Sequence, residues 1–282
     1  MKYLIVNADD YGLNENINRG IIRAYSEGIV TSTSILANGE AFLSGVEALK
    51  ENPGLGVGVH LTLVNGHPLS PVAEIPSLLN KDGDFMADYH QFFSHFLRGK
   101  IKPAEIYAEW AKQILYVKNQ GIKITHLDSH QHLHIFPGIN NIVVTLATEF
   151  DIHKVRLPAE NIFFGETLPS LSRSFARDML TGISAMSKFN FHKKHLITPN
   201  HFYGMLWGGH LNENRLTTII RQLPSGISEI MTHPGTNNQA LEAKFAWGYN
   251  WTEELTALTS VKLRDLVQQL NVQLINYQDL MM

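Results

Sequence analysis

The amino-acid sequence contains no cysteine. This absence excludes a disulfide framework, a thiolate zinc site and a thiol nucleophile. Neither sign of charge is in large excess, since the formal net charge is -3 and no long basic or acidic run occurs. Nucleic acid and anionic membrane surfaces are therefore not favoured as partners.

Long apolar runs are missing as well. No stretch approaches the ~20 apolar residues of a membrane-spanning helix, and the first residues show neither a charged leader nor a cleavage signal. We therefore expect no membrane span and, by default, a cytoplasmic location. No linker or internal repeat is visible, and α/β barrels commonly run to about 250 residues as one unit. We predict a single domain over residues 1–282.

The stretch Leu4 to Gly12 reads Leu-Ile-Val-Asn-Ala-Asp-Asp-Tyr-Gly. A buried strand is predicted at its start, and that strand ends in two adjacent carboxylates, Asp9 and Asp10. Adjacent acids repel each other and resist burial, and a bound cation would relieve this penalty. We predict that one aspartate holds a metal and that the other moves a proton.

Helical and strand-like periodicity alternate along the chain, which favours an α/β fold with parallel strands and outer helices. The predicted strands lie at residues 4–8, 29–37, 55–63, 122–128, 155–158, 200–207, 228–232 and 272–275. The predicted helices lie at residues 14–28, 42–51, 89–97, 103–119, 137–150, 170–191, 214–223 and 251–270.

Several of the predicted strands end in reactive side chains, which are Asp9 with Asp10, His60, Asp128 with His130, and His233. In a parallel α/β fold the carboxyl ends of all strands open on one face, which is where active sites form. Residues that are far apart in sequence are therefore predicted to converge on one site.

Histidine is abundant, with 14 residues, and it is densest between His126 and His134, where every second residue is His or Asp. A strand would place these side chains on one face, whereas a helical turn would pair His130 with His134. Zinc, nickel, cobalt and manganese accept imidazole, and mixed carboxylate–imidazole sets leave positions open for water and substrate. The predicted ligands are one aspartate of the doublet, His60, and one or two residues of the cluster. The other carboxylate is a candidate general base, and His233 a candidate general acid.

Simpler interpretations exist for single residues. His60 alone is more often a packed histidine than a ligand, and Arg156 is as readily a buried salt-bridge partner as a substrate contact. Trp207 and Trp247 are expected to pack in the core or in loops rather than to form a sugar platform. The histidines expected to be surface or structural are His67, His90, His95, His153, His192, His195 and His201.

Taken together, the motifs resemble the YdjC-like carbohydrate deacetylases, a family that includes chitooligosaccharide deacetylases and a deacetylase associated with hopanoid biosynthesis. They run in family order from residue 3 to about 236, and Arg264 with Leu274 to Tyr277 resembles the family's closing pattern. The matching motifs are Asn7-Ala8-Asp9-Asp10-Tyr11-Gly12, Gly28 to Ser34, Gly58 to Leu63, His126 to His132, Val155-Arg156-Leu157-Pro158 and Glu229 to Gly235.

The resemblance implies a distorted TIM-like (β/α) barrel. It implies an enzyme, a hydrolase of C–N amide bonds that removes an acetyl group from an N-acetylated amino sugar or glycoconjugate. It also implies a divalent metal ion, with Mg²⁺ or Zn²⁺ favoured, on Asp10, His60 and His130.

The catalytic residues that the resemblance implies are Asp9, His233 and Arg156. Asp9 would be the base that activates water, His233 the acid for the leaving amine, and Arg156 a residue that orients Asp9 or contacts substrate. The expected partner is a small or oligosaccharide N-acetylated sugar. A homodimer is compatible with the sequence, although no residue indicates one.

Two other hypotheses stay open at this point. The first is another metal-dependent hydrolase on a barrel, acting on a cyclic amide or phosphoester, which a second metal bridged by Asp128 and His132 would favour. The second is a non-catalytic carbohydrate-binding protein, which loss of the acid or the base would favour; neither is lost here.

Overall fold

The structure, a computed structural model, describes residues 1–160 and 171–280. Its centre is a sheet of parallel strands in the order β4-β3-β2-β1-β6-β5. A further strand, β7, pairs with residues 2–4 of β1, before β2 begins to pair at Asn7. The strands are β1 (Lys2–Tyr11), β2 (Ser32–Ile35), β3 (Gly56–Leu61), β4 (Ile124–Ser129), β5 (His201–Tyr203), β6 (Gly226–Thr232) and β7 (Val272–Leu274).

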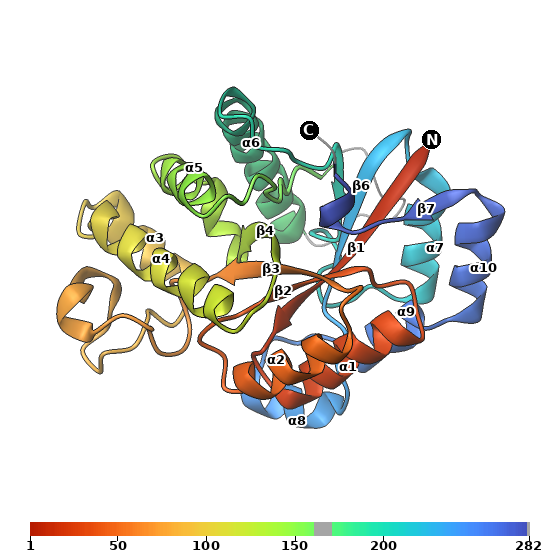
Figure 1. Cartoon of the computed structure of the whole chain (residues 1–282), viewed down its shortest axis with the longest axis horizontal. Coiled ribbons are helices and arrows are strands. Elements are labelled where there is room, and N and C mark those ends of the chain that lie inside the picture. Colours follow the sequence, from red (N-terminus) through yellow and green to blue (C-terminus); the bar gives the residue numbers. More distant parts are fainter. Residues whose placement is uncertain (161–170, 281–282) are drawn as a thin grey trace.

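Helices surround the curled sheet on its outside, as Figure 1 shows. The predicted α/β fold is confirmed, and the distorted barrel takes the form of a half-barrel. The α-helices are α1 (Glu15–Ser26), α2 (Phe42–Glu51), α3 (Tyr89–Leu97), α4 (Pro103–Asn119), α5 (Ile139–Glu149), α6 (Leu171–Lys193), α7 (Glu213–Gln222), α8 (Asn238–Phe245), α9 (Trp251–Leu258) and α10 (Val261–Gln269). The 3₁₀ turns are η1 (Val72–Glu74), η2 (Pro76–Leu78), η3 (His130–Ile135) and η4 (Tyr277–Asp279).

Strand β1 is buried on both faces, which explains its near-continuous apolar run. Leu4 and Val6 belong to the large core that packs the helices against the sheet. Ile5 points to the other face, where it packs with Tyr277 and Leu280. Residues that follow the last strand thus pack against this face near the amino end of β1.

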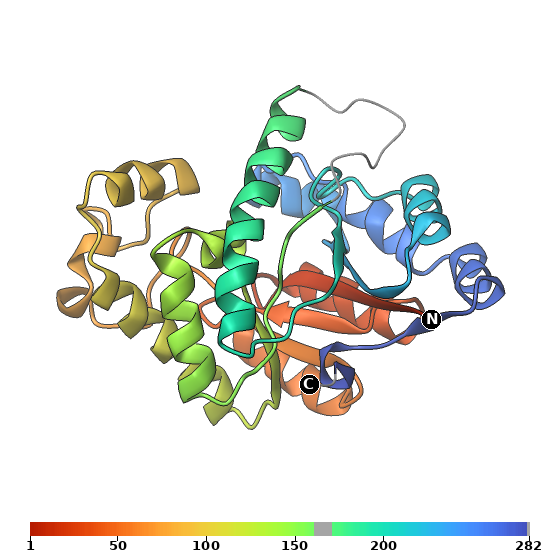
Figure 2. The ribbon, with the colours of Figure 1, turned by 90° about the horizontal axis from the view of Figure 1, so that it is seen from above.

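The two edges of the sheet, β4 and β5, do not pair with each other directly. Segment 154–160 lies between them, and single-residue parallel bridges join Leu127 to Val155 and Glu160 to Phe202. Figure 2 shows α5 and α6 side by side over this part of the molecule.

The strand predicted over residues 155–158 is therefore wrong as a regular strand. Pro158 has no N–H to donate to a ladder. The carbonyl of Arg156 faces the Nε2 of His134 at 3.0 Å, so a side chain takes the place of a strand partner.

The single helix predicted over residues 251–270 is also wrong, because α9 ends at Leu258 and α10 begins at Val261. The carbonyl of Leu258 accepts the N–H of Ile29, 3.2 Å away, instead of continuing the helix. Helix α8 was not predicted, and only its Leu241 is buried, which leaves little apolar periodicity to detect. Of the helix predicted over residues 170–191, Ser170 lies outside the described residues.

A search of the described parts of the chain finds no helix with the length and apolar character needed to cross a membrane.

Helix α1 and the turn that follows β6 approach each other at Gly20. A Cβ built on Gly20 would lie 2.4 Å from the Cα of Gly235. Because Gly235 belongs to the His233-Pro234-Gly235 turn, we expect Gly20→Ala to lower stability by ~1–3 kcal/mol through overpacking. We also expect a lower kcat, since the backbone that carries His233 must shift. Thermal unfolding and turnover measure the two effects.

The matched control is Gly182→Ala on helix α6, where an added Cβ would meet nothing within 4 Å. This change should leave stability unchanged or raise it by ~0.5–1 kcal/mol, because alanine favours a helix over glycine. Equal effects of the two substitutions would contradict the tight contact at Gly20.

Candidate active site

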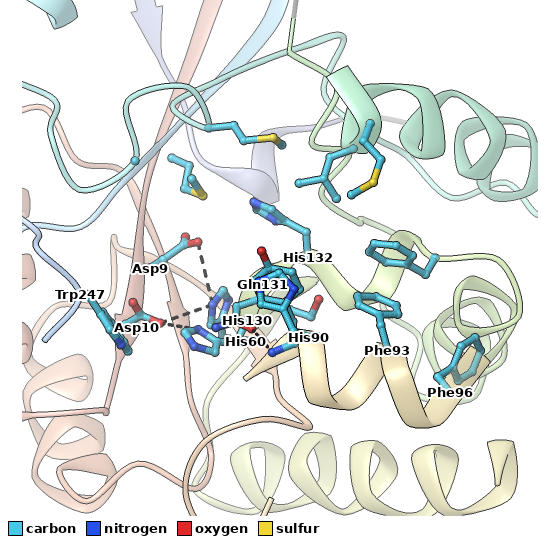
Figure 3. A pocket seen from close by; sticks show the side chains of 18 of the residues that line it. Asp9, Asp10, His60, His90, Phe93, Phe96, His130, Gln131, His132 and Trp247 are labelled. Atoms are coloured by element: carbon cyan, nitrogen blue, oxygen red, sulfur yellow. Dashed lines mark hydrogen bonds and ion pairs between the residues drawn. The ribbon is translucent and has the colours of Figure 1, made fainter. Parts of the chain in front are cut away.

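The carboxyl ends of the strands carry five of the predicted site residues to one cavity of about 1070 Å³. Asp9 and Asp10 come from β1, and His60 from β3. His130 begins the 3₁₀ turn after β4, and His233 follows β6. Figure 3 shows the carboxylates of the doublet facing the rings of His60 and His130.

Adjacent residues of a regular strand point to opposite faces, yet Asp9 and Asp10 both line this cavity. The backbone of Asp10 explains the exception, because its φ of 67° lies in the left-handed region. The β1–β2 register is also irregular between Ala8 and Tyr11. This local irregularity is of the kind that collects at functional sites, where it re-aims a side chain.

Asp10, His60 and His130 form a set that fits a metal ion. Their ligand atoms all lie within 4.8 Å of one another. The Oδ1 of Asp10 is 3.1 Å from His130 Nδ1 and 3.6 Å from His60 Nε2. Burial alone would raise the pKa of Asp10, but His130 and the other nearby histidines outweigh burial and hold it well below its usual range. An ionised carboxylate beside two imidazoles is a donor set that divalent metals accept.

His60 is held in position by Asp128 of β4. Its Nδ1 donates to Asp128 Oδ1 at 2.9 Å, which leaves Nε2 directed toward Asp10. A carboxylate behind a ligating histidine is the usual way in which proteins orient such a ring. Burial favours the neutral ring, but Asp128, Asp9 and Asp10 outweigh it and raise the pKa of His60 to about 9.

Asp9 is held by Arg156 through two hydrogen bonds of 2.6 and 2.7 Å. Arg156 is fully buried and does not line the cavity. It also contacts Asp128 at 2.7 Å and Glu229 at 2.9 Å, and Tyr277 donates to Glu229 at 2.6 Å. These contacts fit a residue that orients Asp9 and not one that touches substrate.

A second set, Asp9, His60 and Asp128, also lies close enough to hold an ion. Both of its carboxylates already bind Arg156. A cation placed there would face the guanidinium at close range, so the set with Asp10 is the better candidate.

His233 lies on the side of the cavity near Tyr249, with the two rings 5.0 Å apart. Its backbone N–H donates to Glu254 at 2.6 Å, which fixes the turn. Burial lowers the pKa of the ring, while Asp10 and Asp9 oppose this effect. The ring thus lies in a buried place that disfavours its charged form, with carboxylates beside it that favour protonation.

The other histidines of the cluster occupy three different environments. His126 is buried and stacks on Tyr277 with the ring centres 3.7 Å apart. His134 binds Ser129 and the backbone of Arg156, so it supports the site from behind. His132 lines the cavity, and its backbone has a left-handed φ of 57°. The alternation seen in the sequence thus breaks at the end of β4, where η3 begins.

Sequence reasoning missed the aromatic wall of the site. Trp247 and Tyr249 line the cavity with rings 5.6 Å apart, and Trp247 lies 5.7 Å from the ring of His130. Trp247 also lines a neighbouring cavity of about 370 Å³. His90, predicted to be surface or structural, lines the large cavity too. The available signal was the aromatic-rich run Phe-Ala-Trp-Gly-Tyr-Asn-Trp at residues 245–251.

A parallel α/β sheet whose strand ends gather carboxylates and imidazoles around a deep cavity has the architecture of a hydrolytic enzyme. The comparisons with known proteins agree with this class. The YdjC-like protein family matches residues 3–269 of the chain. The chain therefore belongs to the YdjC-like family.

Individual relatives match over almost the whole chain. The carbohydrate deacetylase of Brevibacillus brevis is 32% identical, with 98% of this chain and 99% of that protein covered. The carbohydrate deacetylase of Clostridium beijerinckii is 29% identical over the same shares. A crystal structure from Enterococcus faecalis V583, whose name refers to cellobiose-phosphate cleavage, is 25% identical with a TM-score of 0.80 and covers 100% of this chain and 99% of that one.

The ligand set predicts how metal affinity responds to substitution. His60→Ala and His130→Ala should each abolish tight binding of Zn²⁺, because each removes a donor. Asp128→Asn should weaken binding by about 10–100-fold, since it loosens the His60 ring without removing a donor. Isothermal titration calorimetry on the metal-free protein measures all three affinities.

The control for these variants is His153→Ala, which removes an exposed histidine paired with Asp151. Its affinity for Zn²⁺ should equal that of the unchanged protein. If His60→Ala and His130→Ala both bind the ion as tightly as the control does, the ligand assignment is wrong.

Proposed function

We propose that this protein is a metal-dependent carbohydrate deacetylase that hydrolyses the amide of an N-acetylated amino sugar or glycoconjugate. The observation that carries the proposal is one cavity in which a metal-competent set, an Arg156-bound carboxylate and a buried histidine face one another. The names of the relatives support the deacetylase class. We further propose that residues 1–282 act as a single domain. The cytoplasmic location and the homodimer stay predictions.

In this reaction Asp9 accepts a proton from the attacking water. Arg156 holds both oxygens of Asp9, so the carboxylate keeps one orientation. Asp10 is assigned to the metal, which leaves Asp9 as the base. The doublet therefore divides into a base and a ligand.

A divalent cation on Asp10, His60 and His130 would polarise the amide carbonyl and lower the pKa of the attacking water. Two imidazoles with one carboxylate suit Zn²⁺ better than Mg²⁺, which prefers oxygen ligands.

His233 delivers the proton that the departing amine needs. Burial lowers the pKa of the ring and the carboxylates of Asp10 and Asp9 oppose this effect, so the ring can take up the proton that Asp9 accepts from water and pass it to the nitrogen. Trp247 and Tyr249 lie beside it and offer aromatic faces to the sugar ring.

The phosphoester alternative receives no support from the cavity. Among the described residues that line it, none is lysine or arginine. A phosphate-bearing substrate would bring two negative charges toward Asp9 and Asp10 without a lysine or arginine to receive them.

The metal-loaded protein should release acetate from at least one member of a panel of N-acetylated sugars. A chelator should abolish this release, and added Zn²⁺ or Mg²⁺ should restore it. Asp9→Asn should bind metal normally and lose about 100-fold or more in kcat, because it lacks the base. Acetate release and metal content measure these outcomes.

Asp9→Asn is informative because Asp128 and Glu229 still pair with Arg156 after the change. Activity that resists the chelator would refute metal dependence. Full activity of Asp9→Asn would remove Asp9 as the base.

The proposed role of His233 as proton donor is tested by comparing substrates with different leaving groups. His233→Ala should slow hydrolysis of an N-acetyl amide by about 100-fold or more, because an amine leaves poorly without a proton. An acetyl ester with a good leaving group should lose much less. The ratio of the two kcat/KM values, measured for both proteins, gives the comparison.

The backbone N–H of His233, which binds Glu254, is retained in this variant, so the turn should keep its position. Equal losses for amide and ester would show that His233 acts in some other way than as an acid.

A further inference from the structure

The active-site cavity does not end at the metal-competent residues. Beyond His130 it continues between α3 and α6, as the row from His130 to Phe93 and Phe96 in Figure 3 shows. The rings of Phe93 and Phe136 lie 4.0 Å apart and form one wall. The apolar arm, as we name this part, is lined by Phe93, Phe96, Leu97, Phe136, Met179 and Leu180.

The six residues of the apolar arm are all hydrophobic and offer neither a hydroxyl nor a charge, and Ser94 of the same helix α3 adds a single hydroxyl to the cavity lining. Among the described residues that line the cavity, the carboxylates are Asp9 and Asp10, and they lie at the other end. Two residues of the arm are exposed to water, with Leu97 82% and Met179 44% exposed. Covering solvent-exposed apolar surface in a cavity with an apolar ligand is favourable, because it removes that surface from water. An alkyl chain is the ligand chemistry that fits.

The position of the arm relative to His233 indicates which part of the substrate reaches it. His233, Tyr249 and Trp247 lie together on one side of the site, and the ring of Trp247 lies 5.7 Å from His130. Figure 3 shows Trp247 and Phe96 at opposite ends of the view, with His130 between them.

In amide hydrolysis the carbonyl carbon is bonded to the nitrogen, to oxygen and to the acyl chain. The oxygen of water bonds to that carbon, the C–N bond breaks, and the nitrogen leaves with a proton as the free amine. The nitrogen and its sugar must lie toward His233, which supplies the proton. The acyl chain then points away from His233 and toward the apolar arm.

We propose that the apolar arm receives the acyl chain, and that the enzyme hydrolyses amino sugars whose N-acyl chains are longer than acetyl. This inference rests on the proposed function and extends its substrate class from N-acetyl to N-acyl amino sugars. The cavity volume of about 1070 Å³ agrees, because pockets for drug-sized ligands span roughly 300–1,000 Å³.

The test is a series of N-acetyl, N-butyryl, N-hexanoyl and N-octanoyl glucosamine with the metal-loaded protein. Every member releases the same amine, so one assay compares them all. Each methylene that becomes buried should raise kcat/KM by up to roughly fourfold. We expect N-hexanoyl glucosamine to exceed N-acetyl glucosamine by at least about tenfold.

Leu97→Asp and Met179→Asp place a charge in the arm at positions that already reach water. Each should reduce the hexanoyl-to-acetyl ratio by at least about fivefold. The matched control is Leu43→Asp on α2, which is 61% exposed and lines neither cavity. It should keep the ratio and the activity of the unchanged protein.

A kcat/KM that falls with chain length, while N-acetyl glucosamine is still hydrolysed, would overturn the inference and leave the proposed function intact. A gain from an octyl aglycone in place of the acyl chain would also overturn it. If no member released amine, the proposed function would fail, and calorimetry would still decide the inference. Equal affinities of the metal-loaded protein for N-octanoyl and N-acetyl glucosamine would then refute it.

Discussion

One buried guanidinium holds the functional half of the molecule together. Arg156 contacts Asp9 of β1, Asp128 of β4 and Glu229 of β6, and all three carboxylates are buried. It comes from the segment that lies between the two sheet edges, so one side chain ties that segment to three strands. Taking these charges out of water is costly, and only their close mutual contacts offset the cost. Burial raises the pKa of Glu229 to about 7, with Arg156 opposing, so one carboxyl of the three is easily neutralised.

The same guanidinium separates the roles of the two adjacent aspartates. Arg156 pairs with Asp9, whereas the ion-pair partners of Asp10 among the described residues are the imidazoles of His60 and His130. A cation is therefore favoured beside Asp10 and disfavoured beside Asp9. The left-handed backbone at Asp10 makes this possible, since a regular strand would point one of the two away from the site. Both residues are aspartate, so their different environments alone give them different roles.

Much of this could be predicted from the sequence, and the failures have physical causes. Helices with clear apolar faces, such as residues 42–51 and 103–119, were predicted with their observed ends. The site was predictable because reactive residues at the ends of parallel strands must share an edge. The break after Leu258 was not, because a distant residue, Ile29, takes its carbonyl. The wall formed by Trp247 was not predictable either, because aromatic residues in a loop have no regular spacing that indicates which of them line a cavity.

The central place of β1 has a consequence for how the chain acquires its structure. This strand precedes β6 along the chain, yet β6 pairs with one side of it, and Thr232 of β6 donates a hydrogen bond to Asn7 at a separation of 225 residues. Tyr277, which packs under β1 against Ile5, follows later still. Contacts this remote in sequence close slowly and leave hydrophobic strands exposed meanwhile. During synthesis β1 stays unpaired on that side until the residues of β6 have emerged, and over this interval a nascent chain of this fold most needs protection from aggregation.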